Sequence, residues 1–282
     1  MNGEVMVPAL FGLLSGFSFA VANLCGGFAS RRSPALSVTF LAQCAGLALI
    51  AMLVTRVPGH PTSGDLAWGA LAGFFHVFGV VLFYRALARG TMGVVASVMA
   101  VVGVTVPIVV GLLWKETYSP VQLAGIGMGL IAILLLSISS ENQVRTSGKS
   151  DVLQGVVCGL LFGTQLVVFG LASSGSGIWP LLTARSLELL VLAGAALLTR
   201  TRLFPVRAVV GVSFLAGAGQ EGGAAFFLVA RHLGGLSIAA VLSSLDSAFL
   251  VILAWIIIRQ RLYRRQIIGV GLAILAATLI SW

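Results

Sequence analysis

The sequence has very little charge: Asp, Glu, Lys and Arg make up 9% of its 282 residues. Soluble domains carry about 25% charged residues, so these side chains cannot cover a water-facing surface. Hydrophobic residues make up 59% of the chain, and the mean hydropathy is +1.08. These values exclude an ordinary soluble domain and predict an all-α integral membrane protein in contact with the lipid bilayer.

Patterns of reactive and ligand-binding residues are also missing from the sequence. The three cysteines, Cys25, Cys44 and Cys158, fall inside apolar segments, and an odd, separated set gives neither a disulfide framework nor metal-ligand spacing. There is no glycine-rich phosphate loop, and no Ser/His/Asp set in a nucleophile context. The sequence therefore predicts no metal, no cofactor and no enzymatic activity.

The formal net charge of +9 does not indicate nucleic-acid binding, because the basic residues lie in short loops beside apolar segments. In such loops lysine and arginine set membrane topology. The N-terminal side has three, Arg56, Lys115 and Arg231, whereas the opposite side has thirteen. The positive-inside rule then predicts both termini in the periplasm. Arginine outnumbers lysine and no organellar targeting segment is seen, so we expect a bacterial inner membrane.

Apolar segments recur about every 25 to 30 residues, and a span needs roughly 20 apolar residues. Ten transmembrane helices are predicted: 7–29, 34–55, 65–88, 91–114, 119–139, 152–172, 178–199, 208–230, 235–258 and 263–281. Ala20 to Ala22 resembles a signal cleavage site, but no basic region precedes it, so a retained first helix is expected. Glycines four residues apart, such as Gly12/Gly16 and Gly69/Gly73, predict close helix packing.

The chain contains an internal repeat. Residues 86–137, moved forward by 144 positions without a gap, align with residues 230–281 and pair Gly90 with Gly234 and Gln122 with Gln266. The shift covers five spans, an odd number, so the second copy enters the membrane in the opposite orientation. We predict two inverted five-helix halves, 1–140 and 152–282, joined by a polar linker at 141–151. Inverted repeats are typical of secondary transporters, which bind their solute near the bilayer midplane.

Two segments then reveal a family resemblance. The run Phe83 to Leu87, followed by Pro107, Lys115-Glu116 and Gln122 to Gly125, resembles the signature of EamA-type transporters of the drug/metabolite transporter superfamily. The second copy is similar but has Gln260 where the family usually has glutamate. The resemblance implies a basket of ten helices around a central cavity and export of small metabolites or amino acids, with exporters of the YddG type as the suggested subgroup. Members usually have cytoplasmic termini, in contrast to the charge count above.

Polar groups inside the spans are candidates for the solute pathway, because they are expensive at membrane depth. His76, among phenylalanines, and its repeat partner Gln220 are the central pair, which would suit a polar solute with an aromatic or apolar side chain. The full set of cavity candidates is His76, Gln220, Asn23, Gln165, Tyr84, Phe78, Ser97, Met99, Glu221, Ser244 and Asp246. Each has packing within the bundle as its alternative role.

Three of these groups have more specific hypotheses. Asp246 is a candidate cation or proton site, or else a carboxylate paired with a basic group on another helix. Histidine is the side-chain type that ordinarily changes charge near neutral pH, so His76 is also a candidate for proton coupling. Arg185 and Glu188 are three residues apart on one helical face and are predicted to form a structural ion pair. Lys115-Glu116 and Arg259-Gln260, at span ends, are expected to act as anchors.

The sequence thus predicts a monomeric secondary transporter that exports small metabolites, amino acids above all, by alternating access to a midplane cavity. A nucleotide-sugar or phosphorylated-sugar exchanger is the alternative, although only Arg185 is deep enough to bind a phosphate. From another class, a lipid-modifying membrane enzyme could use His76, Glu221 and Asp246 as acid and base groups. A protein without transport activity would leave the polar midplane residues unexplained.

Overall fold

The computed structural model describes residues 3–56, 58–89, 92–137, 149–259 and 264–280. In these ranges the chain is helical and contains no strand, which confirms an all-α fold. The first half contains α1 (Gly3–Ser30), α2 (Ala35–Val54), α3 (Ser63–Arg89), α4 (Met92–Leu113) and α5 (Pro120–Ser137). The second half contains α7 (Lys149–Gly170), α8 (Trp179–Thr199), α9 (Val210–Gly234), α10 (Leu236–Ser243), α11 (Asp246–Ile258) and α12 (Arg264–Ile280), with single 3-10 turns η1 (Ser174–Ser176) and η2 (Arg207–Val209).

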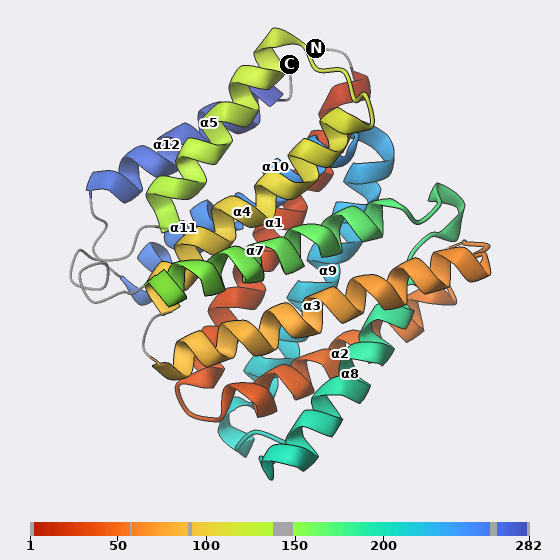
Figure 1. The fold of residues 1–282 in the computed structure, drawn as a ribbon, viewed down its shortest axis with the longest axis vertical. Coiled ribbons are helices and arrows are strands. Elements are labelled where there is room, and N and C mark those ends of the chain that lie inside the picture. The colour runs from red at the N-terminus through yellow and green to blue at the C-terminus, as the bar shows by residue number, and fades with distance from the viewer. Residues whose placement is uncertain (1–2, 57, 90–91, 138–148, 260–263, 281–282) are drawn as a thin grey trace.

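Most of these helices are suited to a membrane. Within the described residues, seven helical segments are long and apolar enough to cross a bilayer, and the apolar stretches Val98–Leu113 and Pro120–Leu136 are shorter. The N- and C-termini lie at the same end of the molecule (Figure 1). Their position agrees with an even number of crossings and fits a multi-pass membrane protein.

The predicted ninth span is found as one membrane-crossing segment over Leu236–Ile257, but its helix is not regular throughout. The ninth was expected to be continuous over 235–258, but it is interrupted between α10 and α11. At the interruption the backbone N–H of Leu245 donates to the carbonyl of Leu242, three residues back, instead of four. The polar run from Ser243 to Ser247 explains the break, because serine and aspartate side chains compete with the helical hydrogen-bond ladder. For example, the Ser247 hydroxyl contacts the carbonyl of Ser244 at 3.4 Å.

Helices α5 and α12, equivalent under the 144-residue shift, pack against each other in opposite directions (Figure 1). Gly125, early in α5, lies against Ile280 at the end of α12, and Gly269, early in α12, lies against Leu136 near the end of α5. The backbone repeats as well: Lys115 and Arg259, also 144 residues apart, both adopt a left-handed conformation, with φ of 59° and 55°. These observations agree with inverted copies, while the exact division into halves stays a prediction.

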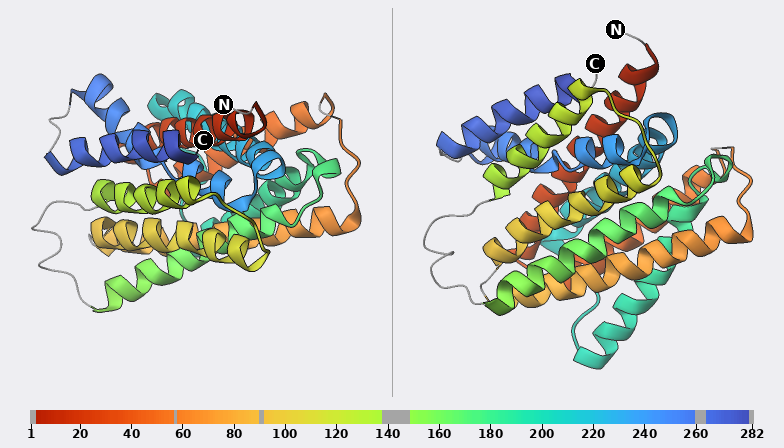
Figure 2. Two further views of the ribbon diagram at one scale, coloured as in Figure 1. Left: turned by 90° about the horizontal axis from the view of Figure 1, so that it is seen from above. Right: turned by 45° about the horizontal axis from the view of Figure 1, so that its top comes forward.

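Two sets of mutually packed helices position the candidate sites; Figure 2 shows the whole arrangement from two further sides. We define bundle A as α3, α4 and α7, in which α7 packs extensively on both α3 and α4. Bundle B is α1, α9, α10 and α11, in which α1 packs on the other three. In the order of the ten predicted spans, bundle A consists of the third, fourth and sixth helices, and bundle B of the first, eighth and ninth. The repeat relates the third helix to the eighth, the fourth to the ninth and the first to the sixth, so the two bundles correspond. Helices α2 and α8 contact each other, with α2 also on α9 and α8 also on α3.

Glycine permits the close approach of α3 and α8. A Cβ at Gly73 would lie 2.8 Å from the Cα of Ala184, which is closer than real side chains pack. A Cβ at Gly127 on α5, in contrast, would meet nothing within 4 Å. Gly73 and Ala184 directly precede the turns that carry His76 and Arg185, so this contact holds the central side chains in place.

We therefore expect Gly73→Ala to lower the free energy of unfolding by about 1–3 kcal/mol, because it forces two backbones apart in a packed interface. The control, Gly127→Ala, makes no clash and gains up to about 1 kcal/mol of helix propensity. Thermal unfolding of the two purified variants in detergent measures the difference. Equal stability for both would contradict the close contact between α3 and α8.

Candidate functional site

Four ionisable side chains meet inside the protein and form what we call the charge cluster: His76, Arg185, Glu188 and Glu221. Arg185 is fully buried, Glu188 and Glu221 are each 1% exposed, and His76 is 7% exposed. They come from α3, α8 and α9, so the cluster joins bundle A to bundle B through α8.

Arg185 is the centre of the charge cluster. Its Nη1 donates to both carboxylate oxygens of Glu188, at 2.7 Å each. On its other edge, Nε forms an ion pair with Oε1 of Glu221. Gly46 of α2 leaves the space for Glu221, since a Cβ there would lie 2.7 Å from the Glu221 Cγ. Arginine suits this place because its planar guanidinium can bond two carboxylates along separate edges.

His76 completes the charge cluster on the α3 side. Its Nδ1 lies 3.0 Å from Oε2 of Glu188, and its ring packs edge-on against Phe162 of α7, with centroids 5.5 Å apart. Since an ionised carboxylate only accepts hydrogen bonds, we assign the imidazole proton to Nδ1. Nη1 of Arg185 is 3.5 Å from the same nitrogen, at the limit of a hydrogen bond.

Four buried polar atoms of the charge cluster have no hydrogen-bond partner within the described residues: Nε and Nη2 of Arg185 and both carboxylate oxygens of Glu221. Nε and Oε1 form the ion pair described above, which leaves Nη2 and Oε2 without a partner of either kind. Glu188, by comparison, uses both oxygens. Glu221 is therefore the less satisfied of the two carboxylates.

A second polar site lies at the interruption between α10 and α11. Oδ2 of Asp246, in the first turn of α11, accepts a hydrogen bond from Nδ2 of Asn23 on α1 at 2.9 Å. Gly16 of α1 packs on the same break, where a Cβ would lie 2.9 Å from the carbonyl oxygen of Leu242. Sequence reasoning offered a basic partner for Asp246, but the contact found is a neutral amide. The carboxylate also accepts a backbone hydrogen bond from Ser247, and it forms no ion pair within the described residues.

Contacts between the bundles also occur at the end of the molecule that holds the termini. Glu116, which follows α4, accepts hydrogen bonds from the backbone N–H groups of Leu236 at 2.6 Å and Ser237 at 3.2 Å, where α10 begins. A carboxylate suits a helix N-terminus because the helix dipole is positive there. Nearby, Nε2 of His232 on α9 lies 3.3 Å from the carbonyl oxygen of Ala172, just after α7. We call this the closed end.

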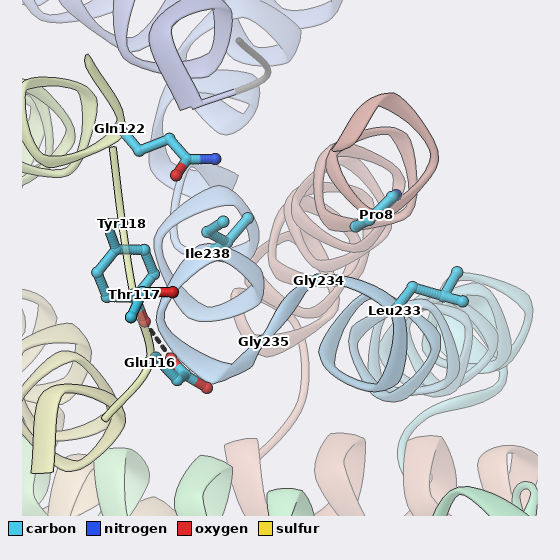
Figure 3. Close-up of a pocket in the computed structure, with 9 residues that line it drawn as sticks. All are labelled: Pro8, Glu116, Thr117, Tyr118, Gln122, Leu233, Gly234, Gly235 and Ile238. Carbon is cyan, nitrogen blue, oxygen red and sulfur yellow. Dashed lines mark hydrogen bonds between the residues drawn. The ribbon is translucent and has the colours of Figure 1, made fainter. Parts of the chain in front are cut away.

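A pocket of about 280 Å³ lies at the closed end, beside the first turn of α10 (Figure 3). It is lined by Pro8, Glu116, Thr117, Tyr118, Gln122, Leu233, Gly234, Gly235 and Ile238. Burial opposes ionisation of Glu116, but hydrogen bonds from Tyr118, Leu236 and Ser237 outweigh it and lower the pKa below its usual 4.5. Burial and the bond to Glu116 raise the pKa of Tyr118, so Tyr118 remains a donor.

Glu116→Gln is expected to destabilise the protein by about 1–2 kcal/mol, because it removes a charged cap from α10. The pKa of Glu116 is lowered in the folded protein, so its stabilisation is present above pH 4.5 and lost as the pH falls through the lowered value. Thermal unfolding between neutral and acidic pH measures this. An equal loss of stability at all pH values would show that the carboxylate charge is not involved.

The other predicted cavity residues occupy several places. Gln220 is half-buried next to Glu221 in sequence and makes no hydrogen bond with described residues, so it is not part of the charge cluster. Gln165 is buried on α7 and Met99 packs beside Val95 and Cys158. Phe78 is 45% exposed and stacks near Phe74, 4.6 Å between centroids. Ser244 ends α10. The side chains of Tyr84 and Ser97 lie outside the described residues.

The role of Glu116 was missed by sequence reasoning, which took it for an anchor at the end of a span. The repeat contained a usable signal: the shift of 144 places Glu116 opposite Gln260, so one half has a charged residue where the other has a neutral one. Residue 260 itself lies outside the described residues.

Comparisons with known proteins agree with the fold. One solved crystal structure matches this chain with a TM-score of 0.71 and 17% sequence identity. The match covers 99% of this chain and 98% of the other. At this identity the match shows the fold alone. A search of curated proteins by sequence found no match. Residues 6–138 match the EamA-like transporter family. This match covers just under half of the chain, so the first half of the chain is similar to EamA-like transporters.

Proposed function

We propose that the protein is a secondary transporter that exports small metabolites, in particular neutral and aromatic amino acids, by alternating access between bundles A and B. The solute binds at the interruption between α10 and α11, beside Asn23 and Asp246. This interruption is the single observation that carries the proposal. Broken helices supply transporters with free backbone groups near the bilayer midplane, where an intact helix has none to offer.

The chemistry of the break suits an amino acid. The Asp246 carboxylate, paired with a neutral amide, can bind an ammonium group, and the carbonyls that end α10 can share the same cation. The N-terminus of α11 faces the same break and favours an anion such as the solute carboxylate. One turn away, Phe249 of α11 and Phe17 of α1 form an edge-to-face pair with centroids 5.7 Å apart, a surface that an aromatic side chain could contact.

Phosphorylated solutes are supported less well. A phosphate needs cationic groups that are free to bind it. Arg185, the one basic residue predicted deep in a span, is already held between Glu188 and Glu221. This arrangement disfavours a nucleotide-sugar exchanger.

Flux from liposomes tests the proposal. Purified protein is reconstituted in vesicles loaded with labelled phenylalanine, leucine or, as a control, glucose. We expect phenylalanine and leucine to leave faster than from protein-free vesicles, and glucose to leave at the protein-free rate. Should neither amino acid leave faster than from protein-free vesicles, the proposed solute class is wrong.

A further inference from the structure

The charge cluster contains an imbalance of charge. Arg185 contributes one positive charge, and Glu188 and Glu221 contribute two negative ones, so the two carboxylates share one permanent cation. An ionised group at the centre of a membrane helix is costly unless it is paired. One cation thus pairs two anions, and one negative charge is left over.

No charge from the surrounding helices corrects this imbalance in the described part of the chain. α3 faces the cluster with His76, α8 with Arg185 and Glu188, and α9 with Glu221. The other contacts are uncharged: α2 contributes Gly46 and α7 contributes the ring of Phe162. A single bound proton would make the cluster neutral.

The geometry indicates which atom would hold that proton. Both oxygens of Glu188 accept from Arg185, so they are occupied. Glu221 is bonded through Oε1 alone, and its Oε2 is buried without a partner in the described residues. An unpaired carboxylate oxygen is costly when charged and much less so as the neutral acid.

We propose that Glu221 is a proton-coupling site: it binds one proton on one side of the membrane and releases it on the other while solute moves the opposite way. On uptake, Oε2 forms an O–H bond with a proton from water. On release, that bond breaks and the proton returns to water on the other side, without redox chemistry. This inference rests on the proposed export function and adds the coupling ion.

The position of the cluster explains how proton and solute would be linked. His76 belongs to bundle A and Glu221 to bundle B, with Arg185 and Glu188 between them on α8. Rocking of one bundle against the other would change the 3.0 Å contact of His76 with Glu188 and hence the field at Glu221. A proton that is bound more tightly in one arrangement shifts the protein toward that arrangement.

Infrared titration tests the site without transport, because a protonated carboxylic acid absorbs apart from a carboxylate. The purified protein is titrated through neutral pH as wild type, Glu221→Gln and, as a control outside the cluster, Asp65→Asn. We expect Glu221→Gln to lack one titrating acid band that wild type and Asp65→Asn share. Glutamine reproduces the neutral, protonated side chain, so this variant is expected to fold. A wild type without the band, or a band that survives in Glu221→Gln, would overturn the proposal.

Liposomes separate this inference from the proposed function. Exchange of labelled for unlabelled phenylalanine without a gradient needs transport but no proton. With one proton per solute, a gradient of one pH unit should accumulate phenylalanine about tenfold. In Glu221→Gln we expect exchange to continue and accumulation to fall to about onefold, whereas Asp65→Asn keeps the response. If the wild type exchanges phenylalanine but a pH gradient does not make it accumulate, proton coupling is wrong and the export function stands. If the wild type does not exchange phenylalanine but shows the infrared band, the amino-acid substrate is wrong and the proton site stands.

Discussion

Replacing Arg185 with methionine is expected to lower the free energy of unfolding by about 3–5 kcal/mol. The change leaves two carboxylates, each 1% exposed, without their shared counter-ion. Breaking a buried ion pair from one side is costly for this reason, whereas replacing all of its members by apolar groups is often neutral. Thermal unfolding in detergent measures the loss.

The control is a variant in which all three charges are removed: Arg185→Met, Glu188→Leu and Glu221→Leu. It has no unpaired charge, so we expect it to recover most of the stability that Arg185→Met loses. If the triple variant is as unstable as the single one, packing around Arg185, and not charge pairing, holds α3, α8 and α9 together.

Asp246→Asn is expected to weaken phenylalanine binding by at least about 30-fold. Losing one partner of a desolvated charge pair costs about 2–5 kcal/mol, and 2 kcal/mol corresponds to a factor of about 30. The asparagine keeps the size of the side chain and its contact with Asn23, but it cannot pair with an ammonium group. The dependence of exchange rate on phenylalanine concentration in liposomes measures the effect.

The matched control is Asp65→Asn. Asp65 caps the start of α3 through the backbone N–H of Thr62 at 2.8 Å and binds the backbone N–H of Ser173 at 2.7 Å. This change is expected to lower stability with little effect on the affinity for phenylalanine. Similar losses of affinity in both variants would mean that Asp246 acts through the fold and does not bind the solute.

Much of the fold could be predicted because it depends on local patterns. Apolar runs of about 20 residues identified the spans, and glycines at equivalent positions revealed the repeat. The interruption of the ninth span was missed. Its serines and Asp246 were recognised as polar, but a polar stretch can also lie on the inner face of an intact helix. The choice depended on α1, which packs on the break through Gly16.

The charge cluster could be predicted only in part. The spacing of Arg185 and Glu188 on one helical turn indicated their contact, which depends on a single helix. Glu221 and His76 join them from other helices, and Gly46 leaves the space for Glu221. Such contacts depend on how helices far apart in the sequence are arranged. The symmetry of the repeat pointed to Gln220 as the partner of His76, one residue away from the glutamate found in the cluster.

Distances between spin labels on bundles A and B test most directly whether the two bundles rock around the break between α10 and α11. One pair, at Leu171 and Leu233, reports on the closed end, and a second, at Leu153 and Ile257, reports on the opposite end; all four side chains are at least 40% exposed. We predict that phenylalanine changes the two distances in opposite directions, and that Asp246→Asn removes the response. Distances that stay fixed with phenylalanine, or that lengthen together, would contradict alternating access.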